Sequence, residues 1–366
     1  MSGYLLAGGG TAGHVNPLLA VADRLRERDA DAEVLVLGTA EGLEARLVPA
    51  RGYELLTIAK VPFPRRPNRA ALAFPSRFSR SIDDVARIIS ERGVEIVVGF
   101  GGYVSTPAYL AARRAGIPVV IHEANAKPGL ANRLGARWAE QVGVAFEGTP
   151  LPHAEVVGMP LRREIESLDR AALRAEAAGF FGLDPDRPVL LATGGSLGAR
   201  RINRTMVDGA ASITGAGWQV LHITGANSEV DDPGVADYRM VEYADRMDLA
   251  LAAADLAVSR AGAATVSELA ALGLPAVYVP YPVGNGEQRF NAAGVVDAGG
   301  GILVDDARFV PEWVDAELVP LLADRDRVAA MAAAAATAGV RDGTARMVAL
   351  IDAALGGGAA HPARGA

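Results

Sequence analysis

The sequence predicts an α/β protein built from two doubly wound, parallel-sheet domains that face each other across a cleft. Its 366 residues suit two domains of roughly 150 to 180 residues better than one core. Glycine occurs 42 times and proline 21 times, which is typical of chains with many strand-to-helix turns. A short apolar strand, a Gly-Gly-hydroxyl-x-Gly turn and a helix occur near the start of each half, with the turns at residues 9–13 and 194–198. This repeat indicates two similar domains.

The composition limits the cellular compartments and the kinds of binding partner that we expect for this protein. Cysteine is absent, which excludes disulfides and thiolate metal sites. The first residues lack a basic segment followed by a long apolar core, so we expect the protein to stay in the cytoplasm. No apolar run reaches the ~18 residues that span a bilayer. The net charge of -7 argues against a nucleic-acid partner.

The first domain opens with an apolar strand at residues 4–7 and the glycine turn that ends at His14. We expect Asn16 to cap the following helix and Pro17 to be its first residue. The glycines satisfy G-x-G-x-x-G, which alone is a weak dinucleotide signal. The second strand, residues 34–37, ends without the acidic residue that such a site needs, and Glu41 comes only beyond the turn. A nicotinamide site is therefore disfavoured.

Two further strands, at residues 94–98 and 118–121, lead into a second glycine loop and into His122, Glu123 and Asn125. Because the carboxyl ends of parallel strands meet at one edge of the sheet, these polar groups should converge there. Each also has an ordinary structural interpretation, such as a capping Asn, a His bonded to backbone, or a Glu paired with Lys127.

The segment 60–81 reverses the acidic character of the chain. It contains six basic residues and no acid, with aromatic and aliphatic residues between them. Such a run is most often a solvated face, but bases mixed with exposed aromatics are also typical of a membrane-surface element. We favour the membrane interpretation. The residues concerned are Lys60, Arg65, Arg66, Arg69, Arg77 and Arg80, with Phe63, Leu72, Phe74 and Phe78.

The prolines and glycines at residues 150–160 indicate a domain change. We expect a first domain at residues 1–160 and a second at 161–340. A helix at about residues 341–355 should pack back on the first domain, and residues 356–366 should be a disordered tail. The second domain should contain strands at residues 189–192, 218–223, 256–258 and 275–279, the last of these being its final strand.

Residues 259–268 predict a nucleotide site. A strand, a small-residue turn and a helix follow one another there, and helix amides favour an anion such as phosphate. Arg260 adds a positive charge, and the Glu268 carboxylate can accept hydrogen bonds from both hydroxyls of a ribose. The alternative is a plain turn in which these two side chains pair. Gln288 and Asn291 should share one helix face, where amides suit sugar hydroxyls.

Taken in order, these loops resemble two-domain glycosyltransferases of the GT-B type, with two Rossmann-like domains, and most closely the MurG family. The resemblance rests on Gly-Gly-Thr-Ala-Gly-His at 9–14, Gly-Gly-Tyr-Val-Ser at 101–105, His-Glu-Ala-Asn at 122–125, Gly-Gly-Ser-Leu-Gly-Ala at 194–199, Ser-Arg-Ala-Gly-Ala at 259–263, and Gln288 with Asn291. It covers nearly the whole chain. Ala12 and Ala124 depart from the family pattern, in which Gly and Gln are common.

The resemblance implies inverting transfer of N-acetylglucosamine from UDP to the 4-hydroxyl of the muramyl sugar of lipid I, giving lipid II for peptidoglycan. The enzyme would be peripheral on the cytoplasmic face of the cell membrane, with anionic lipid as a partner, and would use no cofactor or metal. His14 is the expected base and Glu123 its substitute. The donor would be held by Thr11, Ala12, Gly13, Asn125, Arg162, Ser196, Ala244, Ala263, Ala264, Thr265, Val266, Ser267, Glu268 and Gln288.

Two other functions stay open from the sequence. A UDP-sugar epimerase on the same fold would use the donor site without a lipid acceptor, and the basic aromatic segment argues against it. A nicotinamide-dependent dehydrogenase is disfavoured by the end of the second strand. Asp-x-Asp triplets begin at Asp29, Asp184 and Asp324, away from the glycine loops, so we expect no metal site from them.

Overall fold

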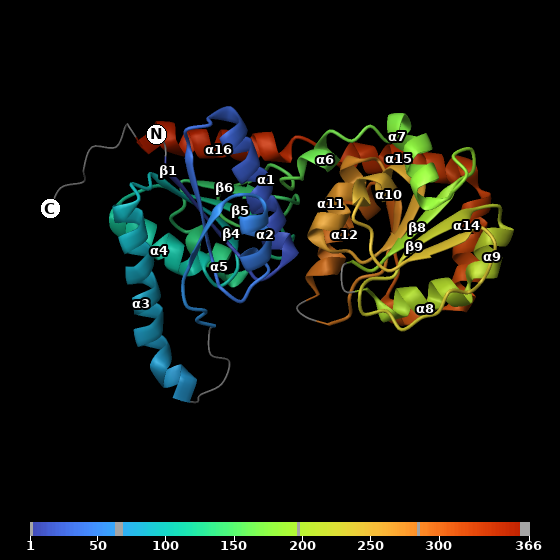
Figure 1. The fold of residues 1–366 in the computed structure, drawn as a ribbon, viewed down its shortest axis with the longest axis horizontal. Coiled ribbons are helices and arrows are strands. Elements are labelled where there is room, and N and C mark those ends of the chain that lie inside the picture. Colours follow the sequence, from blue (N-terminus) through green and yellow to red (C-terminus); the bar gives the residue numbers. More distant parts are fainter. Residues whose placement is uncertain (1–2, 63–68, 196–197, 284–285, 359–366) are drawn as a thin grey trace. The chain divides into compact units, whose positions relative to one another are not determined.

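The computed structural model describes residues 3–62, 69–195, 198–283 and 286–358. The chain divides into two compact units (Figure 1), one made of Met1–Arg162 with Asp342–Ala366 and the other of Arg163–Arg341. Each unit contains one sheet whose neighbouring strands are all parallel, with helices between the strands. The predicted fold class, two doubly wound α/β units, is confirmed.

In the first unit the strand order is β3-β2-β1-β4-β5-β6-β7. The strands are β1 (Gly3–Gly8), β2 (Glu33–Gly38), β3 (Glu54–Thr57), β4 (Ile96–Gly101), β5 (Val119–Glu123), β6 (Gln141–Val144) and β7 (Ala154–Val156). The helices are α1 (Ala12–Arg28), α2 (Glu44–Ala50), α3 (Arg69–Glu91), α4 (Ser105–Ala115), α5 (Leu130–Gly135) and α16 (Gly343–Gly358).

In the second unit the order is β10-β9-β8-β11-β12-β13, which repeats the first six positions of the first sheet. The strands are β8 (Val189–Thr193), β9 (Gln219–Ile223), β10 (Tyr238–Val241), β11 (Leu256–Ser259), β12 (Ala276–Tyr278) and β13 (Gly301–Leu303). The helices are α6 (Arg163–Glu166), α7 (Arg170–Phe181), α8 (Arg200–Asp208), α9 (Ala210–Gly215), α10 (Met247–Ala253), α11 (Ala263–Ala271), α12 (Glu287–Asp297), η1 (Asp306–Arg308), α13 (Pro311–Trp313), the π-helical η2 (Val314–Leu318), α14 (Val319–Ala323) and α15 (Arg325–Ala338).

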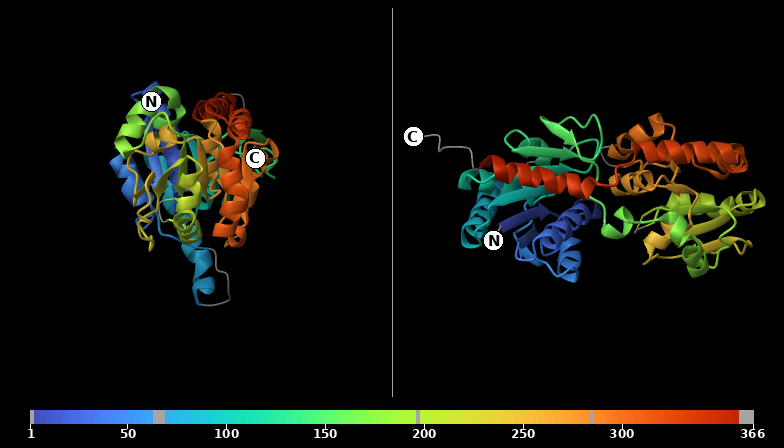
Figure 2. Two further views of the ribbon diagram at one scale, coloured as in Figure 1. Left: turned by 90° about the vertical axis from the view of Figure 1, so that its right-hand side faces the viewer. Right: turned by 90° about the horizontal axis from the view of Figure 1, so that it is seen from above.

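The central strands are apolar throughout because helices cover both faces of each sheet. In β1, Tyr4 and Leu6 belong to a core cluster shared with α1 and α16. Leu5 and Ala7 point to the opposite face, into a cluster shared with α3 and α4. The last helix, α16, thus returns to the first unit and lies along it (Figure 2).

The start of α1 differs from the prediction. The helix begins at Ala12 with Thr11 at the cap position, not at Asn16, and Pro17 lies inside it. Gly10, at φ +86°, turns the chain directly after β1. The amides of His14 and Val15 then already reach the carbonyl of Thr11 at 3.1 Å. Pro17 has no N–H to give to the preceding turn, which the helix tolerates.

Other differences concern short elements and the end of the chain. The sequence interpretation missed β3, β6, β10 and β13, and the strand expected to be the last is followed by β13. The short length of these strands gave little periodicity to detect. The expected tail begins too early, because α16 continues to Gly358. Residues 359–366 lie outside the described part.

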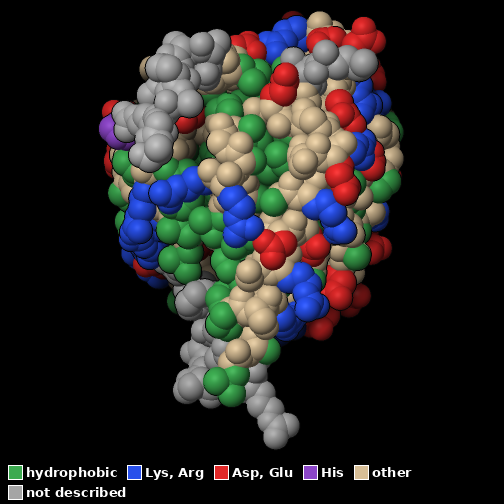
Figure 3. Space-filling model, turned by 90° about the vertical axis from the view of Figure 1, so that its left-hand side faces the viewer, with side chains coloured by type: hydrophobic (Ala, Val, Ile, Leu, Met, Phe, Trp, Pro, Cys, Tyr) green, Lys and Arg blue, Asp and Glu red, His purple; other side chains and the backbone are tan. Residues whose placement is uncertain are grey.

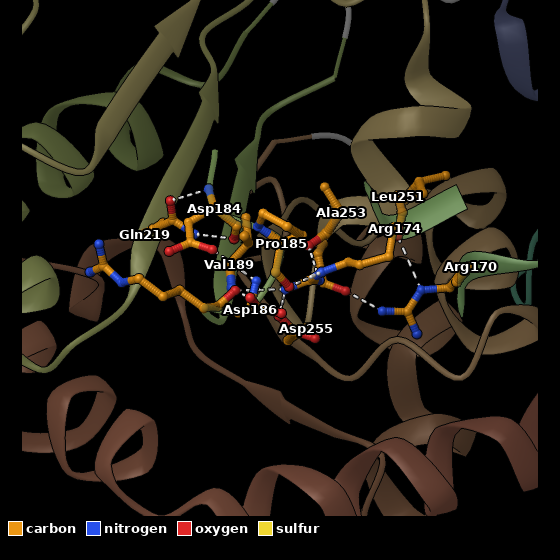
Figure 4. Close-up of polar contacts among 12 residues, drawn as sticks. Arg170, Arg174, Asp184, Pro185, Asp186, Val189, Gln219, Leu251, Ala253 and Asp255 are labelled. Carbon is orange, nitrogen blue, oxygen red and sulfur yellow. Dashed lines mark hydrogen bonds and ion pairs between the residues drawn. The ribbon is translucent and has the colours of Figure 1, made fainter. Parts of the chain in front are cut away.

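A polar network fixes the amino ends of the second sheet (Figure 4). The Arg174 guanidinium donates to the carbonyls of Pro185 and Ala253 and to the Asp255 carboxylate, the last at 3.0 Å. Asp255 also accepts from the backbone N–H of Val189, the first residue of β8, at 2.8 Å. Arg174 therefore connects α7 to the starts of β8 and β11, at the sheet edge opposite to the glycine turns.

Candidate active site

Several of the predicted site residues lie where the strand order of each sheet reverses. In the first unit this point lies between β1 and β4, and in the second between β8 and β11. Loops leaving the carboxyl ends of these strands diverge to opposite faces, and open α/β sheets bind ligands in the resulting crevice. The turn before His14 follows β1, and Arg260 follows β11. Each unit thus has its own candidate site.

His14 lies in the first turn of α1, partly exposed. Its Nδ1 is 3.0 Å from the carbonyl oxygen of Gly9 and 3.2 Å from the Thr11 hydroxyl. A carbonyl only accepts, so the Gly9 contact requires a proton on Nδ1. In the neutral imidazole, Nε2 then carries the lone pair. A base needs this arrangement, with one nitrogen held by the protein and the other able to take a proton.

The loop after β4 lies against this turn. A Cβ on Gly101 would come within 3.0 Å of His14 Nε2, and one on Gly102 would come within 2.6 Å of the Gly9 carbonyl oxygen. Both glycines also have positive φ, at +99° and +89°. The buried Ser105 hydroxyl connects the loop to β1, accepting from the Gly101 N–H and lying 3.1 Å from the Ala7 carbonyl. Glycine is needed at both positions because Gly101 lies against the His14 ring and Gly102 lies against the backbone of Gly9.

Glu123, at the end of β5, is 2% exposed. Its carboxylate accepts hydrogen bonds from the N–H groups of Asn125 and Gly129 and from the Asn132 side chain, at 2.9 to 3.0 Å. Both oxygens are therefore committed to the loop that carries Asn125. This geometry favours a positioning role for Glu123 over its expected role as substitute base.

His122, the neighbour of Glu123, is fully buried and donates from Nε2 to the carbonyl of Gly158 at 2.9 Å. Burial lowers its pKa to about 4, so it is neutral at working pH. Asn125 is half-buried, and Arg162 is half-buried at the end of the first unit. Thr11 and Ala12 are exposed at the turn, and Gly13 is partly exposed.

The second glycine turn repeats the first at its sharpest point. Gly195 has φ +87°, against +86° for Gly10. A Cβ at either position would meet nothing within 4 Å, so glycine is required there for its backbone conformation and not for space. The two turns then diverge, because α8 begins at Arg200 whereas α1 begins at Ala12. Ser196 lies outside the described residues.

A buried network, which the sequence interpretation did not foresee, supports this turn. The Asn203 amide donates to the carbonyl of Thr224 at 2.8 Å and to the Ser228 hydroxyl at 3.0 Å. Its Oδ1 lies 3.2 Å from His222 Nε2, and His222 Nδ1 lies 2.8 Å from the Tyr238 hydroxyl. The network holds the loop after β9 beside Gly198.

The turn 260–262 leads into α11, with Ala263 at its first position and Ala264 and Thr265 in the first turn. Arg260 donates to the carbonyls of Val279 and Pro280 at 3.0 and 3.2 Å, and to Asp306 at 2.6 Å. Arg260 does not pair with Glu268, which contradicts the alternative of a plain paired turn. Its charge is instead balanced by Asp306, so Arg260 holds the ends of β11 and β12 together.

Of the two amides of α12, Asn291 faces this turn, whereas Gln288 binds the loop that follows β12. Asn291 is buried and its Nδ2 lies 3.3 Å from the Ala261 carbonyl. Gln288 accepts from the backbone N–H of Tyr281 at 2.9 Å. Helix α11 packs against α12 and carries Val266, Ser267 and Glu268, the last two of them partly exposed. Ala244 follows β10 and is partly exposed.

Glu44 was missed by the sequence interpretation. This fully buried residue opens α2, and its carboxylate accepts from the N–H of Gly10 at 2.8 Å and from the N–H and hydroxyl of Thr39 at 2.9 and 2.8 Å. Burial opposes ionisation, but these hydrogen bonds outweigh it and lower the pKa of Glu44. The signal in the sequence was an acid shortly after the Gly-Thr that ends β2.

Comparison with known proteins places the two units in one family. Residues 4–144 match the glycosyltransferase family 28 N-terminal domain, and residues 189–347 match the glycosyltransferase family 28 C-terminal domain. The chain belongs to glycosyltransferase family 28. Both matched regions contain one glycine turn and the switch point beside it, so the family's two domains correspond to the two candidate sites.

Relatives within family 28 are close. A protein of Leifsonia xyli subsp. xyli is 69% identical over 96% of this chain and 98% of its own length, and one of Streptomyces coelicolor is 52% identical over 95% and 96%. Both are named UDP-N-acetylglucosamine--N-acetylmuramyl-(pentapeptide) pyrophosphoryl-undecaprenol N-acetylglucosamine transferase. The predicted resemblance to the MurG family is confirmed.

Solved structures agree with this assignment. The crystal structure of Acinetobacter baumannii MurG is 29% identical, covers 96% of this chain and 100% of its own, and gives a TM-score of 0.78. A UDP-GlcNAc 2-epimerase from Neisseria meningitidis gives 0.69 at 15% identity, with coverage of 96% and 100%. At that identity the epimerase shares the fold alone.

Proposed function

We propose that this family 28 enzyme transfers N-acetylglucosamine from UDP-N-acetylglucosamine to undecaprenyl-pyrophosphoryl-MurNAc-pentapeptide, converting lipid I to lipid II in peptidoglycan synthesis. The observation that carries the proposal is the 69% identity to a transferase so named, which extends over 96% of this chain and therefore includes both units. The epimerase alternative has only the fold in its favour.

The reaction we propose is a single displacement with inversion. The 4-hydroxyl of the muramyl sugar loses its proton to Nε2 of His14 while its oxygen attacks C1 of the donor sugar. The bond from C1 to the β-phosphate oxygen breaks, and UDP leaves with the electron pair. The Nδ1–H of His14, held by the carbonyl of Gly9, fixes the tautomer that this step requires.

The second unit provides the donor site in this proposal. The amides at the start of α11, at Ala263 to Thr265, face an anion and stabilise the charge that develops on UDP. Glu268 accepts from the ribose hydroxyls, and Gln288 and Asn291 hold the surrounding loops. Ser196 on the pyrophosphate, Ala244 at the uracil, and Asn125 and Arg162 as further donor contacts remain predictions from the resemblance. Arg260 acts through the loop that it holds.

We further propose that α3 attaches the first unit to the membrane surface. Its amino-terminal half extends beyond the rest of the unit, and Figure 3 shows hydrophobic side chains on this projecting part. Leu72 is 84% exposed there, and the rings of Phe74 and Phe78 stack 5.3 Å apart. Arg77 and Arg80 are exposed on the same half. Phe63, Arg65 and Arg66 lie outside the described residues.

The properties of α3 suit attachment to the membrane surface better than a span across the membrane. Within the described ranges, no helix is both long and apolar enough to cross a membrane. The exposed Leu72 and the partly exposed Phe74 and Phe78 can enter the lipid boundary, while the arginines are attracted to anionic headgroups. The lipid-linked acceptor would then be taken from the same surface.

Incubation with labelled UDP-N-acetylglucosamine and a lipid I analogue tests the proposed function. We expect label in the disaccharide lipid and release of one UDP per product. Formation of an epimerised UDP-sugar without acceptor would instead support the epimerase. Tight binding of NAD, measured by thermal shift beside UDP, would support the dehydrogenase and overturn the proposal.

A further inference from the structure

We propose that Glu44 is a positioning residue for the reaction, acting on His14 through the single peptide group that joins Gly9 to Gly10. This inference rests on the proposed role of His14 as base, and it adds a residue that the sequence motifs do not include. The inference has three links: the hydrogen bonds of the Glu44 carboxylate, the two ends of the Gly9–Gly10 peptide group, and the contact of that peptide with His14.

The first link is the unusual environment of the Glu44 carboxylate. It is 0% exposed and has no ion-pair partner among the described residues. Glycines make room for it, because a Cβ on Gly9 or Gly42 would come within 2.4 or 2.2 Å of its oxygens. A buried carboxylate without a cation is costly unless hydrogen bonds satisfy it. Here Gly10 and Thr39 provide them.

The second link is that Gly10 N and Gly9 O belong to the same planar peptide group. In a trans peptide the N–H and the C=O point in opposite directions. Glu44 Oε2 binds the N–H end at 2.8 Å, and His14 Nδ1 binds the C=O end at 3.0 Å. The carboxylate, the peptide group and the imidazole are therefore connected by a continuous chain of hydrogen bonds. Hydrogen bonds at the two ends of an amide polarise and strengthen each other.

The third link is the choice of tautomer. The Thr11 hydroxyl, 3.2 Å from Nδ1, can donate or accept, so it does not decide which nitrogen of His14 is protonated. The Gly9 carbonyl does decide, provided that its peptide keeps its orientation. Glu44 fixes that orientation, and Gly102 leaves the carbonyl accessible, because a Cβ there would come within 2.6 Å of the oxygen.

The substitution Glu44→Gln tests this chain of hydrogen bonds from Glu44 to His14, which we call the relay. Each carboxylate oxygen accepts from a backbone N–H, one from Gly10 and the other from Thr39. A glutamine amide has one oxygen and one NH2 group, so in either orientation an N–H faces an N–H. We expect kcat to fall roughly tenfold to a hundredfold, as part of the contribution of the base is lost. The dissociation constant for UDP should stay within about twofold.

The tautomer itself provides a readout that does not depend on activity. In 15N-histidine NMR spectra, with His14→Gln to identify the signal, neutral His14 of the parent should be protonated at Nδ1. In Glu44→Gln the Nε2–H form should become populated. Failure of the transfer assay in the parent would reject the proposed function and leave this test intact.

Tyr53→Phe is the matched control, since it removes a partly buried hydrogen bond of the same unit, 2.8 Å from the Tyr53 hydroxyl to Asp23. It should lower the melting temperature without lowering kcat. If Glu44→Gln keeps the parent's kcat or the Nδ1–H tautomer, the relay is wrong. If that variant does not fold, the parent spectrum still decides, because an Nε2–H His14 there overturns the proposal.

Discussion

Nε2 of His222 lies 3.2 Å from Oδ1 of Asn203 in the interior of the second unit. Because the Asn203 amide nitrogen already donates to Thr224, its oxygen must accept, so His222 donates from Nε2 and accepts from Tyr238 at Nδ1. Both nitrogens are used by the neutral ring. Protonation would leave the added proton facing the Tyr238 hydroxyl.

The first prediction concerns acid stability. Burial lowers the pKa of His222 to about 4, against about 6.5 in an unfolded chain. Well above pH 6.5, His222 is neutral in both the folded and the unfolded state. As the pH falls from 6.5 towards 4, the unfolded state takes up a proton that the folded state refuses, so stability is lost. At pH 5 the loss should be about 2 kcal/mol for this one histidine.

This loss of stability can be measured by urea unfolding of the parent and of His222→Gln at pH 7.5 and at pH 5. The variant should be less stable at pH 7.5, yet should lose about 2 kcal/mol less on acidification. Equal losses in both proteins would mean that His222 is protonated in the folded state. His122, whose pKa burial also lowers to about 4, should contribute a similar loss in the first unit.

The second prediction tests the nucleotide site. Glu268→Ala should weaken UDP binding by roughly tenfold to a hundredfold, because a charge-assisted hydrogen bond contributes ~1.5 to 3 kcal/mol. Calorimetric titration with UDP measures the change. Glu317→Ala removes an exposed acid of the same unit and should bind UDP as the parent does. An unchanged dissociation constant in Glu268→Ala would remove the ribose assignment.

The third prediction separates two roles of His14. If Nε2 takes the acceptor proton, His14→Ala should lower kcat by on the order of a hundredfold to ten-thousandfold and leave UDP binding near normal. Both quantities should be measured on one preparation. Weak UDP binding with intact turnover at saturating donor would identify a phosphate contact instead of a base.

The fourth prediction tests membrane attachment. Leu72→Ser combined with Arg77→Ser and Arg80→Ser should weaken binding to anionic vesicles by roughly thirtyfold, counting ~1 kcal/mol for each arginine. Activity on full-length lipid I should fall, and activity on a short-chain soluble acceptor should not.

The control variant removes two arginines that are already paired with acids, Arg87 with Asp84 and Arg114 with Asp83. Arg87→Ser with Arg114→Ser changes the net charge by the same amount but should sediment with vesicles nearly as the parent does. Equal sedimentation of both variants and the parent at low salt would mean that this half of α3 is only a solvated face.

The fifth prediction concerns the polar network of Figure 4. Asp255→Ala leaves the Val189 N–H and the Arg174 guanidinium without their carboxylate. The free energy of unfolding should fall by about 1 to 3 kcal/mol. UDP affinity of the folded protein should not change, because the network lies at the opposite edge of the sheet. Asp186→Ala, at an exposed turn position, should be nearly neutral, and equal melting curves would contradict the assignment.

The glycine turns, the polar ends of the strands and the two-unit organisation were predictable because each is encoded within a few neighbouring residues. The α1 boundary was not, since the general preference for Pro at a helix start was overridden by the turn at Gly10. Glu44 was missed for a different reason. Its partners Gly10 and Thr39 come from the ends of two adjacent strands, and only the folded sheet brings those ends together.

Because the two glycine turns diverge after Gly10 and Gly195, they place different side chains at the same position of the turn. Counting onward from each of these glycines, the position of His14 in the first turn corresponds to Ala199 in the second. The early start of α1 puts a proton acceptor at that position, whereas the longer loop before α8 puts there a methyl group that packs into the core. The first turn thus carries the imidazole that we propose as the base, and the second turn carries a side chain that anchors it to the core. Changes to the first turn should therefore alter the rate of transfer, and changes at Ala199 should alter the packing of the second unit.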